Sequence, residues 1–362
     1  MILYYFLKVS VTSHTKDLIA SLSHLRFNII PSKQKRFDRR MELRSGSAVG
    51  GVPLNDLPEG CWANVLSLTT PRDACRLSAV SPIFKSAAES DVVWQSFLPH
   101  DLESILSTAP DGSLLMSSAS SKKEVYFSLC DNPIIVDNGR KSFSLEKKSG
   151  KKCYVLSAMD LEITWGDTPM YWTWNSISDS RFAEVAELKD VCWFEIRGKI
   201  STCLLSPETL YTAYLVYKFP PRTYGFDNQP VDVTMRLDEG EIGARTVSWN
   251  PQGRRRYING SVTVRGSVHY PKERGDGWLE TELGDFFSAE GEDGELEMRL
   301  FDDSGQWKSG FVLDGIEIRP KDGFAPRYHL RSPFLLMIES CTACHLALLR
   351  VYQVIIYSMK FS

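Results

Sequence analysis

Aromatic side chains crowd one short stretch of this sequence, which contains 9 tryptophans in 362 residues. Trp165 and Trp172 flank a Gly-Asp-Thr-Pro turn, with a further tyrosine and tryptophan beside them. Because a loop presents aromatic rings to solvent more readily than a strand does, this turn is a candidate for contact with a ligand. The competing interpretation is that alternating aromatics fill the core of a sheet, and we assign Trp193 and Trp278 to that buried class.

Carboxylates gather between residues 290 and 303, which is by default a solvated face. A pair of carboxyl groups about 5–10 Å apart could hydrolyse a glycoside, but acidic pairs are too common in this chain to favour that reading. The sequence has no Gly-x-Ser-x-Gly elbow, no His-Glu-x-x-His motif and no Walker loop. We therefore expect a non-catalytic protein with no catalytic residue.

Cysteine chemistry offers one pattern, Cys341-Thr-Ala-Cys344-His345, which matches a c-type haem attachment motif. Nothing nearby supplies a distal ligand, and no second Cys/His pair completes a zinc site. We expect that this match to the haem motif arose by chance, and we therefore expect no cofactor and no metal. The other six of the 8 cysteines lie singly in apolar stretches, which is typical of a reducing compartment. We expect the protein in the nucleus and cytoplasm.

Bulk composition excludes several classes of protein. The chain is 43% hydrophobic and 24% charged, as in ordinary globular proteins, and its length favours about two domains. A formal charge of −3 leaves no basic surplus to neutralise phosphates, so we expect no nucleic-acid partner. We expect residues 1–53 and 322–362 to be extensions without a fold of their own. A membrane anchor in the apolar last 30 residues is the alternative, although Glu339, His345 and Arg350 interrupt that stretch.

Residues 54–100 predict a module of three or four short helices. Thr70-Pro71 and Ser81-Pro82 each combine a capping side chain with a proline in the first turn. Apolar residues at helical spacing follow each start, and Ser90-Asp91 begins a last helix that carries Trp94. A core this small is usually stabilised by a neighbour or a partner.

The order of motifs in this module resembles the F-box. The resemblance is carried by the following residues: Leu57-Pro58, Val65-Leu66, Pro71-Arg72-Asp73, Leu77, Val80-Ser81 and Trp94. It implies that an apolar face docks on a Skp-type adaptor, which bridges to a cullin ubiquitin ligase. By position, five residues would carry much of that contact: Leu57, Pro58, Leu66, Leu77 and Val80. The alternative for each of them is a place in the core of the module.

Residues 101–151 are a predicted linker, because residues 107–123 are rich in Ser, Gly and Asp, although residues 124–129 and 134–136 could add small elements. After this linker the pattern changes to that of strands. Between residues 191 and 200 apolar and charged side chains alternate, and the stretches 210–219, 231–237, 262–268, 295–301 and 312–319 are also predicted strands. Asn-Gly and Asp-Gly turns separate several of them. We therefore predict an α+β multidomain chain in which an antiparallel β-sandwich, jelly-roll-like, occupies residues 152–321.

The predicted sandwich is similar to the phloem lectins of plants. Shared motifs include Trp165-Gly-Asp-Thr-Pro-Met-Tyr-Trp172, Gly277-Trp278-Leu279-Glu280 and the run from Gly291 to Leu300. The resemblance implies binding of N-acetylglucosamine oligomers or N-glycans. It also implies four carbohydrate-binding residues: Trp165, Trp172, Glu295 and Asp302. Asp302 replaces a family glutamate, which keeps the charge but shortens the side chain by one methylene.

Together the two resemblances predict the substrate-recognition subunit of a Skp–cullin–F-box ubiquitin ligase, whose lectin-like domain binds glycans or glycoproteins. Two alternatives stay open. The sandwich binds a protein target without sugar, or the chain is a stress lectin that does not engage the ligase.

Overall fold

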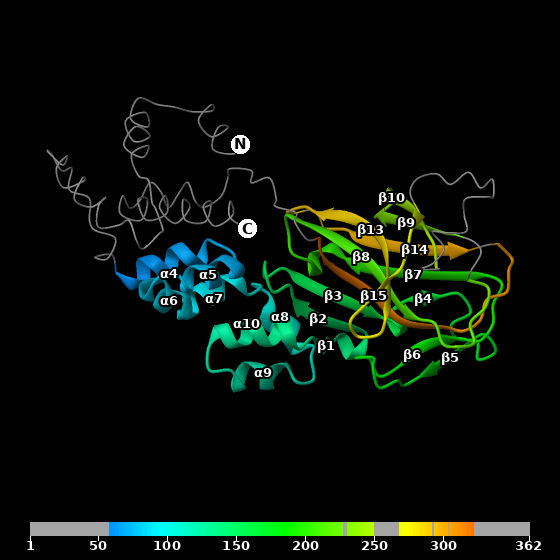
Figure 1. The fold of residues 1–362 in the computed structure, drawn as a ribbon, viewed down its shortest axis with the longest axis horizontal. Helices are drawn as coiled ribbons and strands as arrows, with labels where there is room; N and C mark the ends of the chain where they lie inside the picture. Colours follow the sequence, from blue (N-terminus) through cyan, green and yellow to red (C-terminus); the bar gives the residue numbers. More distant parts are fainter. Residues whose placement is uncertain (1–57, 227–229, 250–267, 292, 303, 322–362) are drawn as a thin grey trace, which may run out of the picture. The chain divides into compact units, whose positions relative to one another are not determined.

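A computed structural model describes residues 58–226, 230–249, 268–291, 293–302 and 304–321 of the chain. Within these ranges a run of helices is followed by a run of strands (Figure 1), which confirms the predicted α+β organisation. The described ranges do not include Leu57, the two predicted extensions, or residues 262–267 of the predicted strand at 262–268.

The helices of residues 58–97 begin where the sequence predicted them. The Thr70 hydroxyl oxygen accepts from the Asp73 N–H at 3.2 Å, and the Ser81 oxygen accepts from the Phe84 N–H at 3.3 Å. Each cap satisfies one of the free N–H groups of a helix N-terminus. No helix in the described ranges is long and apolar enough to cross a membrane. The helices are α4 (Glu59–Ser67), α5 (Pro71–Ser78), α6 (Pro82–Glu89), α7 (Asp91–Phe97), α8 (Leu102–Ser107), α9 (Gly112–Ser118) and α10 (Lys122–Asp131).

Trp94 lies at the centre of the helical core. Its indole N–H donates to the Ala88 carbonyl at 2.7 Å, and its ring packs on Phe97, Tyr126 and Phe127 at centroid distances of 5.1–5.6 Å. Two of these rings belong to α10, so the four short helices of residues 54–100 complete their core with a later helix. This agrees with the expectation that so small a module needs a neighbour.

The segment 101–151, predicted to be a linker with small elements only at 124–129 and 134–136, contains three helices and the first strands. The two small elements are confirmed, as part of α10 and as a strand at 134–136. Leu102, Ile105 and Leu106 are buried on one face of α8, and α10 buries Tyr126 and its apolar neighbours. The Tyr126 hydroxyl donates to the carbonyls of Glu146 and Lys147 at 3.2 Å each, which ties α10 to the turn after β2. Its Ser-rich composition was misleading because the few apolar residues have helical spacing and a partner to cover them.

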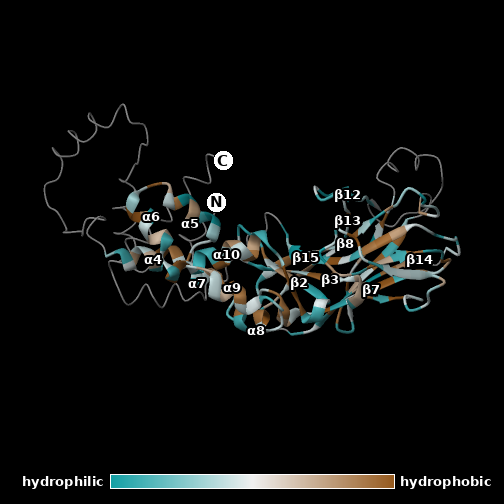
Figure 2. Ribbon diagram, turned by 90° about the horizontal axis from the view of Figure 1, so that it is seen from below, coloured by the Kyte–Doolittle hydropathy of each residue, from teal (hydrophilic) through white to brown (hydrophobic). Residues whose placement is uncertain are grey.

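Two sheets form the β-sandwich, and their strands carry both hydrophobic and hydrophilic residues (Figure 2). One sheet has the strand order β1-β2-β3-β15-β8-β13-β12, with β6 beside β15 and β5 beside β6. The other has the order β11-β10-β9-β14-β7-β4. We call them the nine-stranded and the six-stranded sheet. All described pairs of strands are antiparallel except β10 and β11, which are parallel. The strands are β1 (Ile134–Val136), β2 (Lys141–Leu145), β3 (Lys152–Ser157), β4 (Glu162–Ile163), β5 (Trp172–Asn175), β6 (Val185–Leu188), β7 (Phe194–Ser201), β8 (Thr209–Lys218), β9 (Val231–Leu237), β10 (Gly240–Val247), β11 (Val268–His269), β12 (Lys272–Glu273), β13 (Leu279–Ser288), β14 (Glu295–Asp302) and β15 (Phe311–Pro320).

The inner faces of the two sheets pack tightly. A Cβ atom at Gly198 of β7 would lie 2.8 Å from the Ile316 side chain of β15, and one at Gly284 of β13 would lie 2.1 Å from the sulfur of Met235 in β9. Glycine at these two positions lets the sheets approach each other. Burial of Phe194, Ile196 and their alternate neighbours on β7 leaves the intervening residues on the outer face of the six-stranded sheet.

Candidate functional site

Trp165 lies in an exposed turn that follows β4. The Thr164 N–H donates to the Glu195 carbonyl at 3.1 Å, which sets this turn beside the start of β7. The Trp165 side chain is 54% exposed, and its backbone has φ = 63°, a left-handed conformation that is rare for a large side chain. Strained backbone of this kind persists only where its surroundings hold it, and it is common at binding sites.

Two indole groups hold this turn from within. Trp172 donates its Nε1–H to the Thr164 carbonyl at 3.2 Å, and Trp174 donates to the Gly166 carbonyl at 3.0 Å. Trp172 itself is only 2% exposed and packs against Phe194 at a centroid distance of 6.1 Å. In this position its ring offers no face to a sugar. The structure therefore gives Trp172 a part in positioning Trp165, in place of the ligand contact that we predicted for it.

Asp302 is also buried, with its side chain turned inward at the end of β14. Its carboxylate pairs with the ammonium group of Lys308 at 2.9 Å, and both side chains are almost inaccessible. The ammonium group also donates to the Ser304 hydroxyl and the Gln306 carbonyl. This pair fixes the turn between β14 and β15, so Asp302 does not face the surface on which we expected it to receive a sugar hydroxyl.

Glu295 lies at the opposite end of the same strand. It is exposed, and its carboxylate lies 3.4 Å from the ammonium group of Lys199. In the register of β14 and β7, Glu295 pairs with Ser201, whereas Phe301 pairs with Glu195, beside the Trp165 turn. Six residues at about 3.3 Å each separate the two levels, or roughly 20 Å. The structure does not bring Glu295 and Trp165 into one site.

Two other aromatic residues lie beside Glu195, whose carbonyl and carboxylate accept hydrogen bonds from Thr164 of the Trp165 turn. Trp193, which we assigned to the core, is 48% exposed, and its ring meets that of Phe301 edge-on at 5.4 Å. The prediction was wrong because Trp193 immediately precedes buried Phe194, and alternation along β7 then places it on the outer face with Glu195. The alternation in the sequence was therefore sufficient to place Trp193 on the outer face.

A network of charged groups accompanies these rings. The Arg299 guanidinium lies over the Phe301 ring at 4.5 Å and donates to the Glu195 carboxylate at 2.6 Å. Arg197 donates to the same carboxylate oxygen at 2.9 Å. Partial burial raises the pKa of Glu195, but hydrogen bonds from Arg299 and Arg197 outweigh it and hold the pKa below its usual range.

We call this region the aromatic surface: Trp165, Trp193 and Phe301 with Glu195 and Arg299. It combines flat apolar faces with fixed donors and acceptors. Such a combination suits the C–H face of a pyranose ring with its hydroxyl groups, and it equally suits a protein surface.

The predicted adaptor residues, like the predicted carbohydrate residues, are divided between buried and exposed positions. Leu66 and Leu77 are fully buried and fill the core of the helical module. Pro58 and Val80 are exposed, and Val80 is 56% accessible at the end of α5. Exposed Val92 on α7 was not among the predicted residues. An adaptor could contact the exposed residues directly, whereas Leu66 and Leu77 would act only through the fold.

Comparison with known proteins gives both halves of the chain a family. Residues 54–96 match the F-box domain family, and residues 151–320 match the family described as Phloem protein 2. "F-box protein At2g02240" from Arabidopsis thaliana is 46% identical over 299 residues, covering 80% of this chain and 89% of that protein. "F-box protein PP2-B10" from the same plant is 43% identical over 285 residues, covering 78% of this chain and 98% of that protein. These matches span the helices and the sandwich together.

Proposed function

Because the chain belongs to the family of F-box proteins that carry a phloem protein 2 domain, we propose that it is the substrate-recognition subunit of a Skp–cullin–F-box ubiquitin ligase. The helical region binds the Skp-type adaptor and the β-sandwich captures the target. The protein acts in the nucleus and cytoplasm and catalyses no reaction itself.

We further propose that the aromatic surface binds glycans that contain N-acetylglucosamine. The observation that carries this proposal is the exposed ring of Trp165, whose strained turn is held by two indole donors, the buried Trp172 and the partly buried Trp174. An exposed tryptophan with a carboxylate and a guanidinium beside it provides a stacking face and hydrogen-bonding groups at once.

Calorimetric titration of the full chain with N-acetylglucosamine oligomers and a high-mannose N-glycan tests this proposal. Saturable binding is expected, and Trp165→Ala and Trp193→Ala should each weaken it at least about tenfold, as loss of a stacking ring does. Phe287→Ala is the matched control, since Phe287 is an exposed aromatic residue on the nine-stranded sheet. Equal losses in all three variants would contradict a sugar site at the aromatic surface.

A second candidate is that the aromatic surface binds a protein target without sugar. The observation that favours it is the separation of the four predicted carbohydrate residues, of which Trp172 and Asp302 are buried and Glu295 is distant. A folded chain that binds none of the glycans, but still co-purifies with a ubiquitinated protein in a manner sensitive to Trp165→Ala, would establish this candidate.

A further inference from the structure

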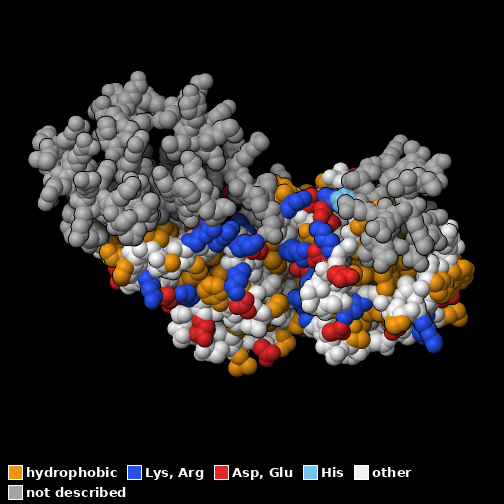
Figure 3. All heavy atoms as spheres, viewed as in Figure 1, with side chains coloured by type: hydrophobic (Ala, Val, Ile, Leu, Met, Phe, Trp, Pro, Cys, Tyr) orange, Lys and Arg blue, Asp and Glu red, His pale blue; other side chains and the backbone are white. Residues whose placement is uncertain are grey.

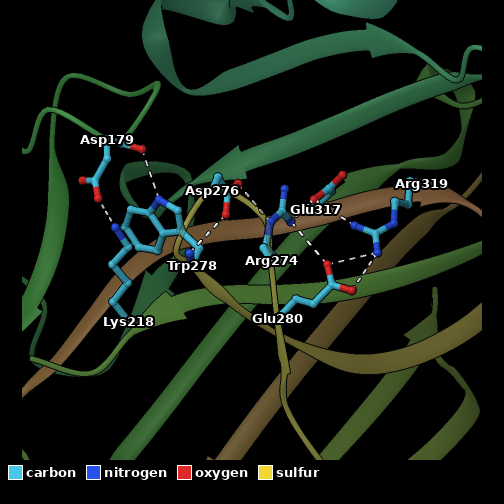
Figure 4. A network of polar contacts seen from close by, with 8 residues as sticks. All are labelled: Asp179, Lys218, Arg274, Asp276, Trp278, Glu280, Glu317 and Arg319. Atoms are coloured by element: carbon cyan, nitrogen blue, oxygen red, sulfur yellow. Dashed lines mark hydrogen bonds and ion pairs between the residues drawn. The ribbon is translucent and has the colours of Figure 1, made fainter.

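Two loops cross the outer face of the nine-stranded sheet and close over a small pocket (Figure 4). The first loop contains Asp179, and the second joins β12 to β13 and contains Asp276. The Trp278 indole N–H connects them by donating to the Asp179 carbonyl at 3.1 Å. The pocket lies over Val155 and Val216, whose side chains are on the side of the sheet away from the main core. On the face of the molecule drawn in Figure 3, acidic and basic side chains lie next to one another over the sandwich.

Most acidic groups around the pocket have a cationic partner. The Arg274 guanidinium lies against Glu317, and Glu317 also contacts Arg319 at 3.1 Å (Figure 4). These contacts hold the pKa of Glu317 low despite its burial. The remaining pairs are Asp179 with Lys218, Asp276 with Arg274, and Glu280 with Arg274 and Arg319.

Asp314 is the exception among the acidic residues that line the pocket. It is only 6% exposed, and its Oδ1 accepts from the Ser180 hydroxyl at 2.6 Å, yet it forms no ion pair with any described residue. Arg181 also lines the pocket, but its hydrogen bond goes to the Ser142 hydroxyl at 3.3 Å. Burial raises the pKa of Asp314, against the smaller lowering effects of the Ser180 hydrogen bond and of the charges of Arg181 and Arg274, neither of which lies within ion-pair distance.

A buried carboxylate without an ion pair is costly, and a cation that enters from solvent and contacts it directly would lower that cost. We propose that this pocket binds the cationic end of one lysine or arginine side chain of a partner protein, with Asp314 as its counter-ion. The pocket has a cavity volume of about 30 Å³, far below the usual range of small-molecule sites of about 300–1,000 Å³. The Trp278 ring is buried and cannot stack on a sugar. This proposal is independent of glycan binding, which we assign to the other sheet.

Ligand-observed NMR titration of the full chain tests the pocket directly. The probes are N-acetylarginine methylamide and N-acetyllysine methylamide, and the citrulline analogue of the first is the neutral control. At least one cationic probe is expected to bind with a Kd in the millimolar range, and the citrulline analogue should not bind. Asp314→Asn should weaken binding about tenfold or more, since it removes the charge but keeps the shape. Glu295→Gln, a carboxylate change on the other sheet, should leave the Kd unchanged.

Three results would overturn the proposal. They are equal binding of the citrulline analogue, equal loss in both variants, and no binding of either cation at about 10 mM. Should Asp314→Asn fail to fold, Ser180→Ala provides the test, because it leaves the carboxylate charged and removes its neutral donor. Cation binding should then be retained or strengthened, and its loss would contradict the role of Asp314.

Discussion

In both the helical region and the β-sandwich, some of the predicted contact residues are buried and others are exposed. The buried residues of the two regions differ in how they affect the exposed ones. In the helical region Leu66 and Leu77 are buried by apolar contacts, and Val80 is exposed. In the sandwich Trp172 and Asp302 are buried, and Trp165 is exposed. The difference lies in what the buried residues do: Trp172 donates a hydrogen bond directly to the turn that carries Trp165.

A core residue can therefore affect a surface in two ways, through the overall stability of the fold or through a hydrogen bond to a particular loop. A leucine in the helical core supports the adaptor face only through overall stability, because its contacts are not directional. A buried tryptophan or ion pair in the sandwich can move a particular loop, because hydrogen bonds fix distance and direction. A substitution in the sandwich core should therefore change local structure as well as stability.

Breaking the buried Asp302–Lys308 pair should have the largest effect. Asp302→Ala leaves an uncompensated ammonium group inside the sandwich, and we expect a loss of about 3–5 kcal/mol in the free energy of unfolding. Urea unfolding of the full chain measures it. Glu295→Gln is the control, because its exposed ion pair with Lys199 is worth little. A loss of similar size in both variants would show that burial does not distinguish the two carboxylates.

Trp172→Phe tests whether a hydrogen bond from a buried residue controls the Trp165 turn, and its expected effect on stability is smaller. A smaller aromatic ring is kept, but the hydrogen bond to the Thr164 carbonyl is lost, which alone should cost about 1–3 kcal/mol. Amide hydrogen exchange should accelerate at Thr168, whose N–H donates to the Trp165 carbonyl. Leu77→Ala, a core change in the helical region, serves as the control. If both variants left exchange at Thr168 unchanged, Trp172 would be an ordinary core residue.

The fold was largely predictable from local signals. The caps at Thr70 and Ser81 and the alternation along β7 and β14 were correctly interpreted, because each depends on residues close in sequence. In the segment 101–151 only small elements at 124–129 and 134–136 were expected. The full extent of α10 and the burial of Tyr126 were not, because that burial depends on Trp94 and on the turn after β2, which are distant in sequence. Composition alone could not show that these partners exist.

The site was less predictable for a related reason. Periodicity gives the face of a strand on which a residue lies, so Trp193 and Phe301 could have been placed outward together with Glu195. It does not give the level of a residue along a neighbouring strand, and that level separates Glu295 from Trp165 by roughly 20 Å. The unpaired Asp314 depends on two loops that only the structure brings together.

The charged part of the aromatic surface should show a pH dependence. The pKa of Glu195 is lower in the folded chain than its ordinary value of 4.5. The stability that its ionised form contributes is therefore fully present above about pH 4.5 and is lost as the pH falls through the folded pKa. Glu195→Gln should cost about 1 kcal/mol at neutral pH. In urea unfolding as a function of pH, this difference should shrink below pH 4.5, and a difference that grows there would contradict the sign.

The smallest effect on stability, and the sharpest contrast between the regions, is expected for Val80→Lys. Val80 is exposed at the end of α5, so the change in unfolding free energy should stay within about 0.5 kcal/mol. Co-purification with a Skp-type adaptor should nevertheless be lost, because a charge then enters an apolar contact. Leu77→Ala should do the reverse: it should lower stability by about 2–5 kcal/mol while the fraction that stays folded still binds the adaptor. Retained binding by Val80→Lys would remove this residue from the adaptor face. Failure of the unaltered chain to co-purify with the adaptor would instead favour a lectin that acts without the ligase.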